Sequence, residues 1–303
     1  MIFKKIKRIF KKSEEKSDEI SPLKFMLKLI NANNPGKLYE HFIDSEEGVV
    51  ATRERLRVRQ TALMNTIDKK SMDIFGTSMQ HVINGSKLFP ALTIKYTYNG
   101  REEVSSLTFG ELLYLYMASK QTQGLLKLVK MGISEAKRDE IKNALGHKYI
   151  EFADWVQEEF LPNLHKEYNE TYQKIYGKTM FMYDNFFPLI CENEEISNKV
   201  SDSYKNEIEV LPETIIGQLV DMYKYNNINN NLLVGVNAFE LLLIHLDEME
   251  EWNAYAQIRR DFVFLLKNEK LKSHLEENHK GAYERLKLAV KIATLTHRTN
   301  RVY

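Results

Sequence analysis

Cysteine, proline and glycine are scarce in this sequence, and it contains no long hydrophobic run. The 303 residues include one cysteine, six prolines and thirteen glycines. The single cysteine, Cys191, excludes an internal disulfide and favours a reducing compartment. No apolar stretch approaches the ~20 residues that a membrane-spanning helix needs, and the N-terminus lacks the apolar region and cleavage site of a signal peptide. So little proline and glycine favours long helices over many turns.

Basic charge is concentrated at the start of the chain. The formal net charge is +1, yet "MIFKKIKRIFKK" holds six basic side chains and no acidic one. The rest of the chain therefore carries about −5, which argues against a general nucleic-acid binder. The spacing of the apolar residues predicts a short basic amphipathic helix. A solvated tail, or a helix docked on an acidic partner, is the favoured interpretation, and binding to anionic lipid or nucleic-acid phosphate is the alternative. The candidate binding residues of this arm are Lys4, Lys5, Lys7, Arg8, Lys11 and Lys12.

One β-hairpin is expected in an otherwise helical chain. Asn99-Gly100 suits a two-residue turn, because both positions of such a turn need positive φ. The preceding residues alternate between apolar and polar side chains, and Glu103 is expected opposite Tyr96. An isolated hairpin is marginally stable in water, so this one must pack on helices.

Helix signals follow the hairpin. Thr108 and Glu111 form a capping-box pair, Ser134 is the expected N-cap of a further helix, and Gly146 is its expected end. Pro162 predicts a kink or a new helix start. The apolar pattern of residues 237–267 predicts one long helix.

An aromatic-rich stretch, residues 149–189, raises the question of a ligand site. Its large apolar residues recur every four positions, a pattern more typical of a buried helix face than of a ligand site. The closing Asn-Phe-Phe-Pro fits a helix end, since residues before proline avoid the α region. The repeating residues are Phe152, Val156, Phe160, Leu164, Tyr168 and Tyr172.

Two clusters of polar residues have a functional and a structural interpretation. The arginines at positions 53, 55, 57 and 59 fan around a helix, and pairing in solvent with Glu46, Glu47 and Glu54 is the favoured interpretation. His245, Glu248 and Trp252 share one side of the long helix. Di-iron bundles repeat Glu-x-x-His on paired helices, whereas His-x-x-Glu occurs once here, so a polar patch against another helix is favoured over a metal site.

No catalytic motif is recognisable. The sequence contains no P-loop, dinucleotide-binding glycine pattern, His-Glu-x-x-His motif or nucleophile elbow. It therefore predicts no catalytic residue, no cofactor and no metal. A catalytic group assembled from distant residues stays open as an alternative.

Several segments together resemble a known family. They include "TFGELLYLYMASKQ", "MGISEAKRDEI", "YIEFADWVQEEFLPNLHKEYNETYQKIYG", "YDNFFPL", "VLPETIIGQLVDMYKY" and "NAFELLLIHLDEMEEWNAYAQIRRDFVFLL". In this order they resemble a helical segment of the large polyvalent proteins of phages and integrated elements, especially those of Bacteroides-type and crAss-like phages. The likeness covers about residues 92–266. Relatives carry the segment within far longer chains, beside nuclease or protease domains, and the resemblance supplies no catalytic residue.

These observations predict a mainly α protein of long antiparallel helices with one hairpin around Asn99-Gly100. The expected domains are an arm and linker (1–21), a helical region (22–90) and a hairpin with a helical bundle (91–303). The resemblance implies a non-enzymatic helical interaction module of a phage or mobile element, located in the virion or the host cytoplasm. Its expected partners are other virion proteins or further copies of itself. A protein that binds DNA or an anionic membrane through the arm is the alternative, as is an enzyme of unrecognised type.

Overall fold

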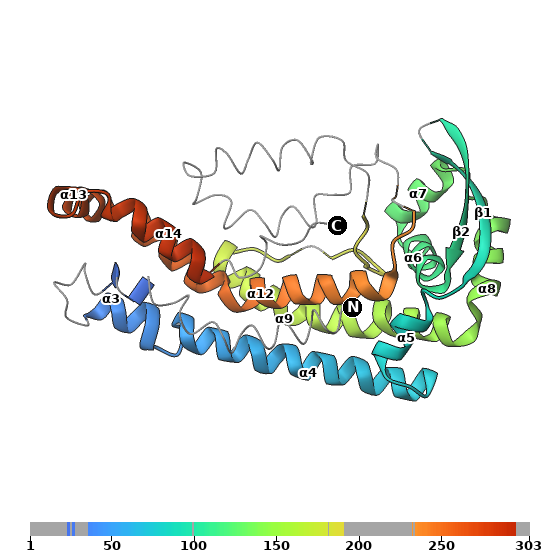
Figure 1. The fold of residues 1–303 in the computed structure, drawn as a ribbon, viewed down its shortest axis with the longest axis horizontal. Coiled ribbons are helices and arrows are strands. Elements are labelled where there is room, and N and C mark those ends of the chain that lie inside the picture. Colours follow the sequence, from blue (N-terminus) through green and yellow to red (C-terminus); the bar gives the residue numbers. More distant parts are fainter. Residues whose placement is uncertain are drawn as a thin grey trace. The chain divides into compact units, whose positions relative to one another are not determined.

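The fold is known from a computed structural model. It describes residues 23–24, 26–27, 36–98, 100–180, 182–190, 232 and 234–294. The described chain is mostly helical and has one two-stranded antiparallel sheet, which confirms the predicted fold class (Figure 1).

The chain forms two compact units. The central unit is Ala62–Met249, and the terminal unit combines Met1–Thr61 with Glu250–Tyr303. Two long helices, α4 (Val49–Phe75) and α12 (Ala238–Leu266), contribute residues to both units. The single long helix predicted for residues 237–267 is confirmed, because α12 runs without interruption over nearly all of these residues.

The terminal unit is built around an apolar cluster. Besides its parts of α4 and α12, it contains α3 (Lys37–Tyr39), the π-helical η2 (Glu40–Asp44), α13 (Glu269–Asn278) and α14 (Ala282–Thr294). Phe42 stacks on Phe262 with ring centroids 4.1 Å apart, and Tyr255, Ile258 and Leu286 are buried in the same cluster. Because these residues come from two segments far apart in the sequence, the unit can fold only when both segments are present.

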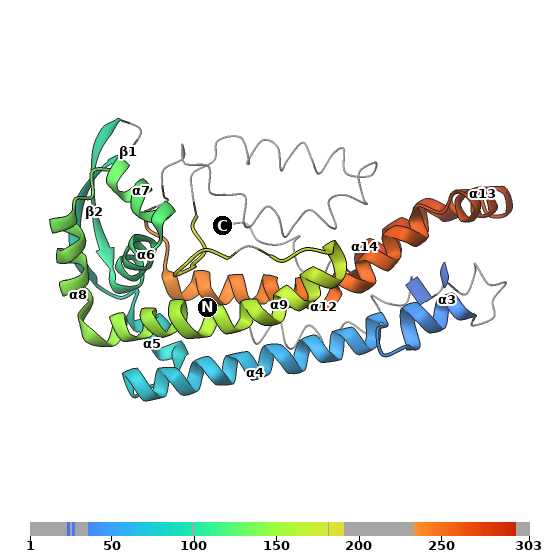
Figure 2. The ribbon, with the colours of Figure 1, turned by 180° about the vertical axis from the view of Figure 1, so that it is seen from behind.

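The central unit holds the hairpin and most of the helices. Its further elements are α5 (Met79–Gly85), β1 (Pro90–Tyr98), β2 (Arg101–Thr108), α6 (Phe109–Ser119), α7 (Thr122–Lys130), α8 (Glu135–Asp154), the π-helical η3 (Trp155–Phe160) and α9 (Leu161–Tyr176). The hairpin packs against α6 and α8, as the marginal stability of a lone hairpin requires (Figures 1 and 2).

The hairpin has the expected register. Tyr96 pairs with Glu103 and Tyr98 with Arg101, while Gly100 adopts a φ of 75° in the turn. Ile94 is fully buried, and an irregularity between Pro90 and Leu92 shifts the register near the start of β1.

The helix signals are largely confirmed. The Glu111 carboxylate accepts hydrogen bonds from the Thr108 amide and hydroxyl, at 2.8 and 2.9 Å, and Ser134 Oγ accepts one from the amide of Lys137. Gly146 ends the helix that begins after Ser134, as expected: its φ of 70° and ψ of 171° are non-helical, and a second helix, counted within the same α8, continues to Asp154. Pro162 is the second residue of α9, which follows directly on η3 with Phe160 and Leu161 both in the right-handed helical conformation.

The aromatic-rich stretch is mainly core. Phe152, Val156, Phe160, Leu164 and Tyr168 are all buried. The hydrophobic repeat therefore serves packing, as its period predicts.

Two arginines of α4, Arg55 and Arg59, have contacts other than the expected solvent-exposed pairs. The Arg55 guanidinium donates to the backbone carbonyl of Glu46 rather than to its carboxylate. Arg59 lies 3.3 Å from the carboxylate of Glu250, a residue of α12 that is only 2% exposed. Sequence neighbours alone suggested the solvent-exposed pairs, whereas folding brings α12 to Arg59.

Candidate functional site

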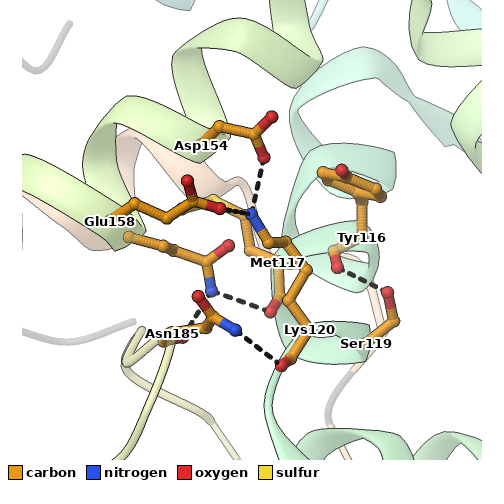
Figure 3. Close-up of polar contacts among 8 residues, drawn as sticks. Tyr116, Met117, Ser119, Lys120, Asp154, Glu158 and Asn185 are labelled. Carbon is orange, nitrogen blue, oxygen red and sulfur yellow. Dashed lines mark hydrogen bonds and ion pairs between the residues drawn. The ribbon is translucent and has the colours of Figure 1, made fainter.

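Polar side chains gather in the central unit where α6 ends, beside η3 and the extended chain that follows α9. We call the six residues Asn185–Ile190 the strap. Figure 3 shows this junction, with side chains from α6, α8, η3 and the strap pointing toward one another. A π-helical segment and a non-glycine residue in left-handed conformation both occur here, features that are frequent at functional sites.

Lys120 lies at the C-terminal cap of α6 between two carboxylates. Its ammonium is 2.5 Å from Asp154 and 2.8 Å from Glu158. Burial by itself would lower the pKa of Lys120, but hydrogen bonds and attraction to both carboxylates outweigh it, so the pKa is raised. The cation also stabilises the negative end of the α6 dipole.

Tyr116 lies one turn before Lys120 on α6 (Figure 3). Burial, followed by the negative charge of Asp154, raises the pKa of its phenol. The phenol is therefore neutral near pH 7 and is unsuited to act as a base there.

Gln157 extends from η3 to the end of α6. It is 1% exposed, and its amide nitrogen donates to the carbonyls of Met117 (3.0 Å) and Asn185 (2.5 Å). The orientation of the amide is set by these two carbonyls, since its oxygen cannot donate to either. Its Oε1 has no hydrogen-bond partner among the described residues.

Asn185 completes the cap of α6. Its Nδ2 donates to the Lys120 carbonyl at 3.3 Å, while Gln157 adds a side-chain hydrogen bond to the Met117 carbonyl, which also accepts from the Lys120 amide. Its φ of 51° is in the left-handed region, which asparagine tolerates better than most residues.

The rest of the strap is held along α6 in the same way. Gln121 Nε2 donates to the Phe187 carbonyl at 2.8 Å, and the Tyr114 hydroxyl both donates to the Ile190 carbonyl and accepts from its amide. The Phe186, Phe187 and Leu189 side chains are buried. Side chains of α6 and η3, together with Gln121 at the N-cap of α7, therefore satisfy backbone groups of an extended segment, whose apolar side chains are buried.

The His245 ring packs against the Phe186 ring of the strap. Its ring centroid is 5.5 Å from that of Phe186, and Nδ1 has no partner among the described residues. Burial lowers its pKa to about 4, so the imidazole is neutral near pH 7. The polar patch expected around His245 is thus replaced, on this side, by an aromatic contact.

The junction is better suited to holding elements together than to chemistry. A lysine kept protonated by two carboxylates is neither a nucleophile nor a base near neutral pH. The Gln157 amide nitrogen uses both of its hydrogens to hold carbonyls. Nowhere in the described chain do three histidine, cysteine or carboxylate side chains come together in a way that could hold a metal ion. Within the same residues, no helix is long and apolar enough to span a membrane.

The candidate residues predicted from sequence lie elsewhere. Lys4, Lys5, Lys7, Arg8, Lys11 and Lys12 are outside the described residues, so the arm stays a prediction. Sequence reasoning missed Lys120 and Gln157, because single polar residues in helical patterns carry no signal of their own. Asn-Phe-Phe-Pro does not end a helix as expected, because α9 already ends at Tyr176, with Gly177 as its left-handed cap. Its proline does fit the extended segment found here.

Comparisons with protein-family models, curated proteins and solved structures find no match to this chain.

Proposed function

We propose that this protein is a non-enzymatic helical interaction module of a phage or mobile element, carried in the particle or acting just after delivery. The phage setting rests on the resemblance to the polyvalent-protein segment. The non-enzymatic role is supported by one observation: at the junction of α6, η3 and the strap, Lys120 and Gln157 hold structural elements together.

The location of the protein can be tested directly. Quantitative mass spectrometry of purified particles of the encoding element should detect the chain at a constant copy number per particle. The same measurement on freshly infected cells, with synthesis of new protein blocked, should detect delivered copies. Absence from both samples would contradict the proposal.

The interaction role is tested by light scattering of the purified chain over a range of concentrations. We expect a defined oligomer, and the same oligomer in a variant lacking residues 1–12, because assembly is assigned to the helical body. A monomer at every concentration in both forms would remove self-association from the proposal and leave other virion proteins as its partners.

The arm supports a second candidate function, binding to an anionic surface. Its six basic residues are concentrated within twelve positions of a chain that is otherwise mildly acidic. Deleting residues 1–12 should abolish co-flotation with anionic liposomes, and unchanged flotation would refute the lipid version. For DNA, binding should weaken strongly between about 50 and 200 mM salt, because phosphate contacts release counterions.

A further inference from the structure

The two strands of the hairpin differ in what covers their outer edges. In an antiparallel pair, residues whose backbone groups bond across the pair alternate with residues whose groups point outward. The Thr97 amide donates to the Met131 carbonyl at 2.7 Å, so Thr97 and the residue opposite it, Glu102, point outward. Met131 thus occupies part of the outer edge of β1. The same alternation places the backbone N–H and C=O groups of Glu102, Val104 and Ser106 on the outer edge of β2.

The outer edge of β2 is open over these three residues. Within the described chain, no hydrogen bond ends on the outward backbone groups of Glu102, Val104 or Ser106, and all three residues are exposed. The open edge stops at Ser106, because the next outward amide, that of Thr108, donates to the Glu111 carboxylate at 2.8 Å. A row of unpaired backbone groups of this kind is a template for one more strand.

The open edge of β2 is complementary to itself. Two β2 strands related by a two-fold axis use all three open positions only when Val104 of one copy lies opposite Val104 of the other. An axis at Glu103 would bring the two Glu103 carboxylates opposite each other, and like charges in that position are destabilising. An axis at Ser105 would pair Glu102 with Thr108, whose amide is already bonded.

The side chains fit the register centred on Val104. Val104 is an apolar, β-branched residue that is 56% exposed, and in this register it packs on its own equivalent across the axis. Glu102 lies opposite Ser106 and Glu103 opposite Ser105, so each carboxylate faces a hydroxyl and no like charges are directly opposite. One strand therefore supplies both the edge and the sequence that complements it.

We propose that β2 pairs in antiparallel orientation with β2 of a second copy of this chain, with Val104 on the two-fold axis, so that two hairpins form one four-stranded sheet. The proposal rests on the proposed function, because it names a second copy as a partner of the interaction module. The hairpin lies outside residues 1–12, in agreement with an oligomer that persists without the arm. A two-stranded sheet is marginally stable alone, and pairing enlarges it. The contact is isologous and closes at two copies.

Charge complementation at position 104 tests the pairing. In Val104→Lys and in Val104→Glu, like charges meet at the axis, so each full-length variant alone should sediment as a monomer at concentrations where the wild type is a dimer. In a mixture of the two variants, opposite charges meet there, and a 1:1 dimer that weakens at high salt should form. Thr93→Lys is the matched control: Thr93 is exposed on β1, away from the axis, and this variant should dimerise like the wild type.

Three results would overturn the proposal. They are a wild type that is monomeric at every concentration, a Val104→Lys variant that dimerises as well as the wild type, and a mixture of the two variants that stays monomeric. Because the Val104 side chain is exposed, neither charge enters the core, and circular dichroism of each variant verifies that it is folded.

Hydrogen exchange of the wild type provides a second readout. The outward amides of Glu102, Val104 and Ser106 should exchange about tenfold or more slowly at a concentration where dimers form than in the dilute monomer. The amides of Glu103 and Ser105 bond within the hairpin in both states, so their rates should change less. Equal rates for the outward amides at both concentrations refute pairing through this edge.

The two proposals fail in different ways. An oligomer that persists in Val104→Lys refutes pairing through β2 and leaves the interaction module standing. A chain absent from both particles and infected cells refutes the proposed setting, whatever the hairpins do.

Discussion

Asn237 fills the space that a side chain on Gly110 would need. A Cβ at Gly110 would lie 1.9 Å from Asn237 Nδ2, well inside van der Waals contact. Asn237 is the N-cap of α12: its Oδ1 accepts from the Phe239 amide at 3.1 Å, and its Nδ2 donates to Ser86 Oγ at 3.2 Å. The start of α6 therefore approaches the start of α12 closely enough that only glycine fits.

Gly110→Ala should accordingly destabilise the protein by about 1–3 kcal/mol, the usual cost of forcing extra atoms into a packed site. The Asn237 side chain would have to leave its capping position. Urea unfolding followed by circular dichroism measures the change. Gly85→Ala is the control, because a Cβ there meets nothing within 4 Å. Equal unfolding midpoints for the two variants would show that Asn237 moves aside for the added methyl group without a loss of stability.

Lys120→Met should cost about 1–2 kcal/mol, because it removes charge-assisted hydrogen bonds to Asp154 and Glu158 and the cation at the end of α6. The Glu158 side chain is 57% exposed, so Glu158→Gln should cost less than about 1 kcal/mol. Thermal unfolding of both variants at low and high salt tests whether Lys120→Met loses more stability than Glu158→Gln. A larger loss for Glu158→Gln would contradict the assigned role of Lys120.

His245 should make stability depend on pH between about 6.5 and 4. Its pKa is about 4 in the folded protein and 6.5 when exposed, so in this range the unfolded chain binds a proton that the folded chain does not. Stability is therefore lost as the pH falls, by roughly 3 kcal/mol once both states are protonated. In His245→Leu this part of the pH dependence should disappear.

The control for this pH dependence is His147, whose side chain is 89% exposed. His147→Gln should retain the full wild-type loss between pH 6.5 and 4. Unfolding midpoints in urea at several pH values provide the comparison. Curves for His245→Leu that run parallel to the wild type would contradict the buried, neutral state of this imidazole.

Arg59→Met should destabilise the terminal unit by about 1–3 kcal/mol, because Glu250, at 2% exposure, loses a cationic partner in a poorly solvated place. Arg57→Met is the matched control on the same helix, since Arg57 is exposed. Equal unfolding midpoints for the two variants would argue that the Arg59 contact contributes nothing.

Local signals predicted local structure well. The turn at Asn99-Gly100, the Thr108–Glu111 cap and the apolar face of α12 depend on neighbours a few residues away, and all were readable from spacing. Gly146 ends its helix as its position predicted, and only the second helix that follows at once was not foreseen, because a positive φ does not prevent another helix from starting.

The contacts of the junction could not be predicted in the same way. Gln157 meets Asn185 across 28 residues, and Arg59 meets Glu250 across 191. Neither pair produces a periodic sequence pattern, since a single glutamine or arginine in a helix cannot be distinguished from any other polar residue there. Only the path of the whole chain brings them together.

The terminal unit can assemble only after the residues that follow the central unit have been synthesised. Its apolar cluster joins Phe42 to Phe262 and Leu286, which are synthesised more than 200 residues after Phe42. The central unit, Ala62–Met249, is complete while the partners of Phe42 are still being made. Because chains generally fold unit by unit as they emerge, Phe42 is synthesised before the central unit yet reaches its native contacts after that unit has formed. Until then, the nascent N-terminal helices expose apolar surface that a chaperone or an early-binding partner could recognise.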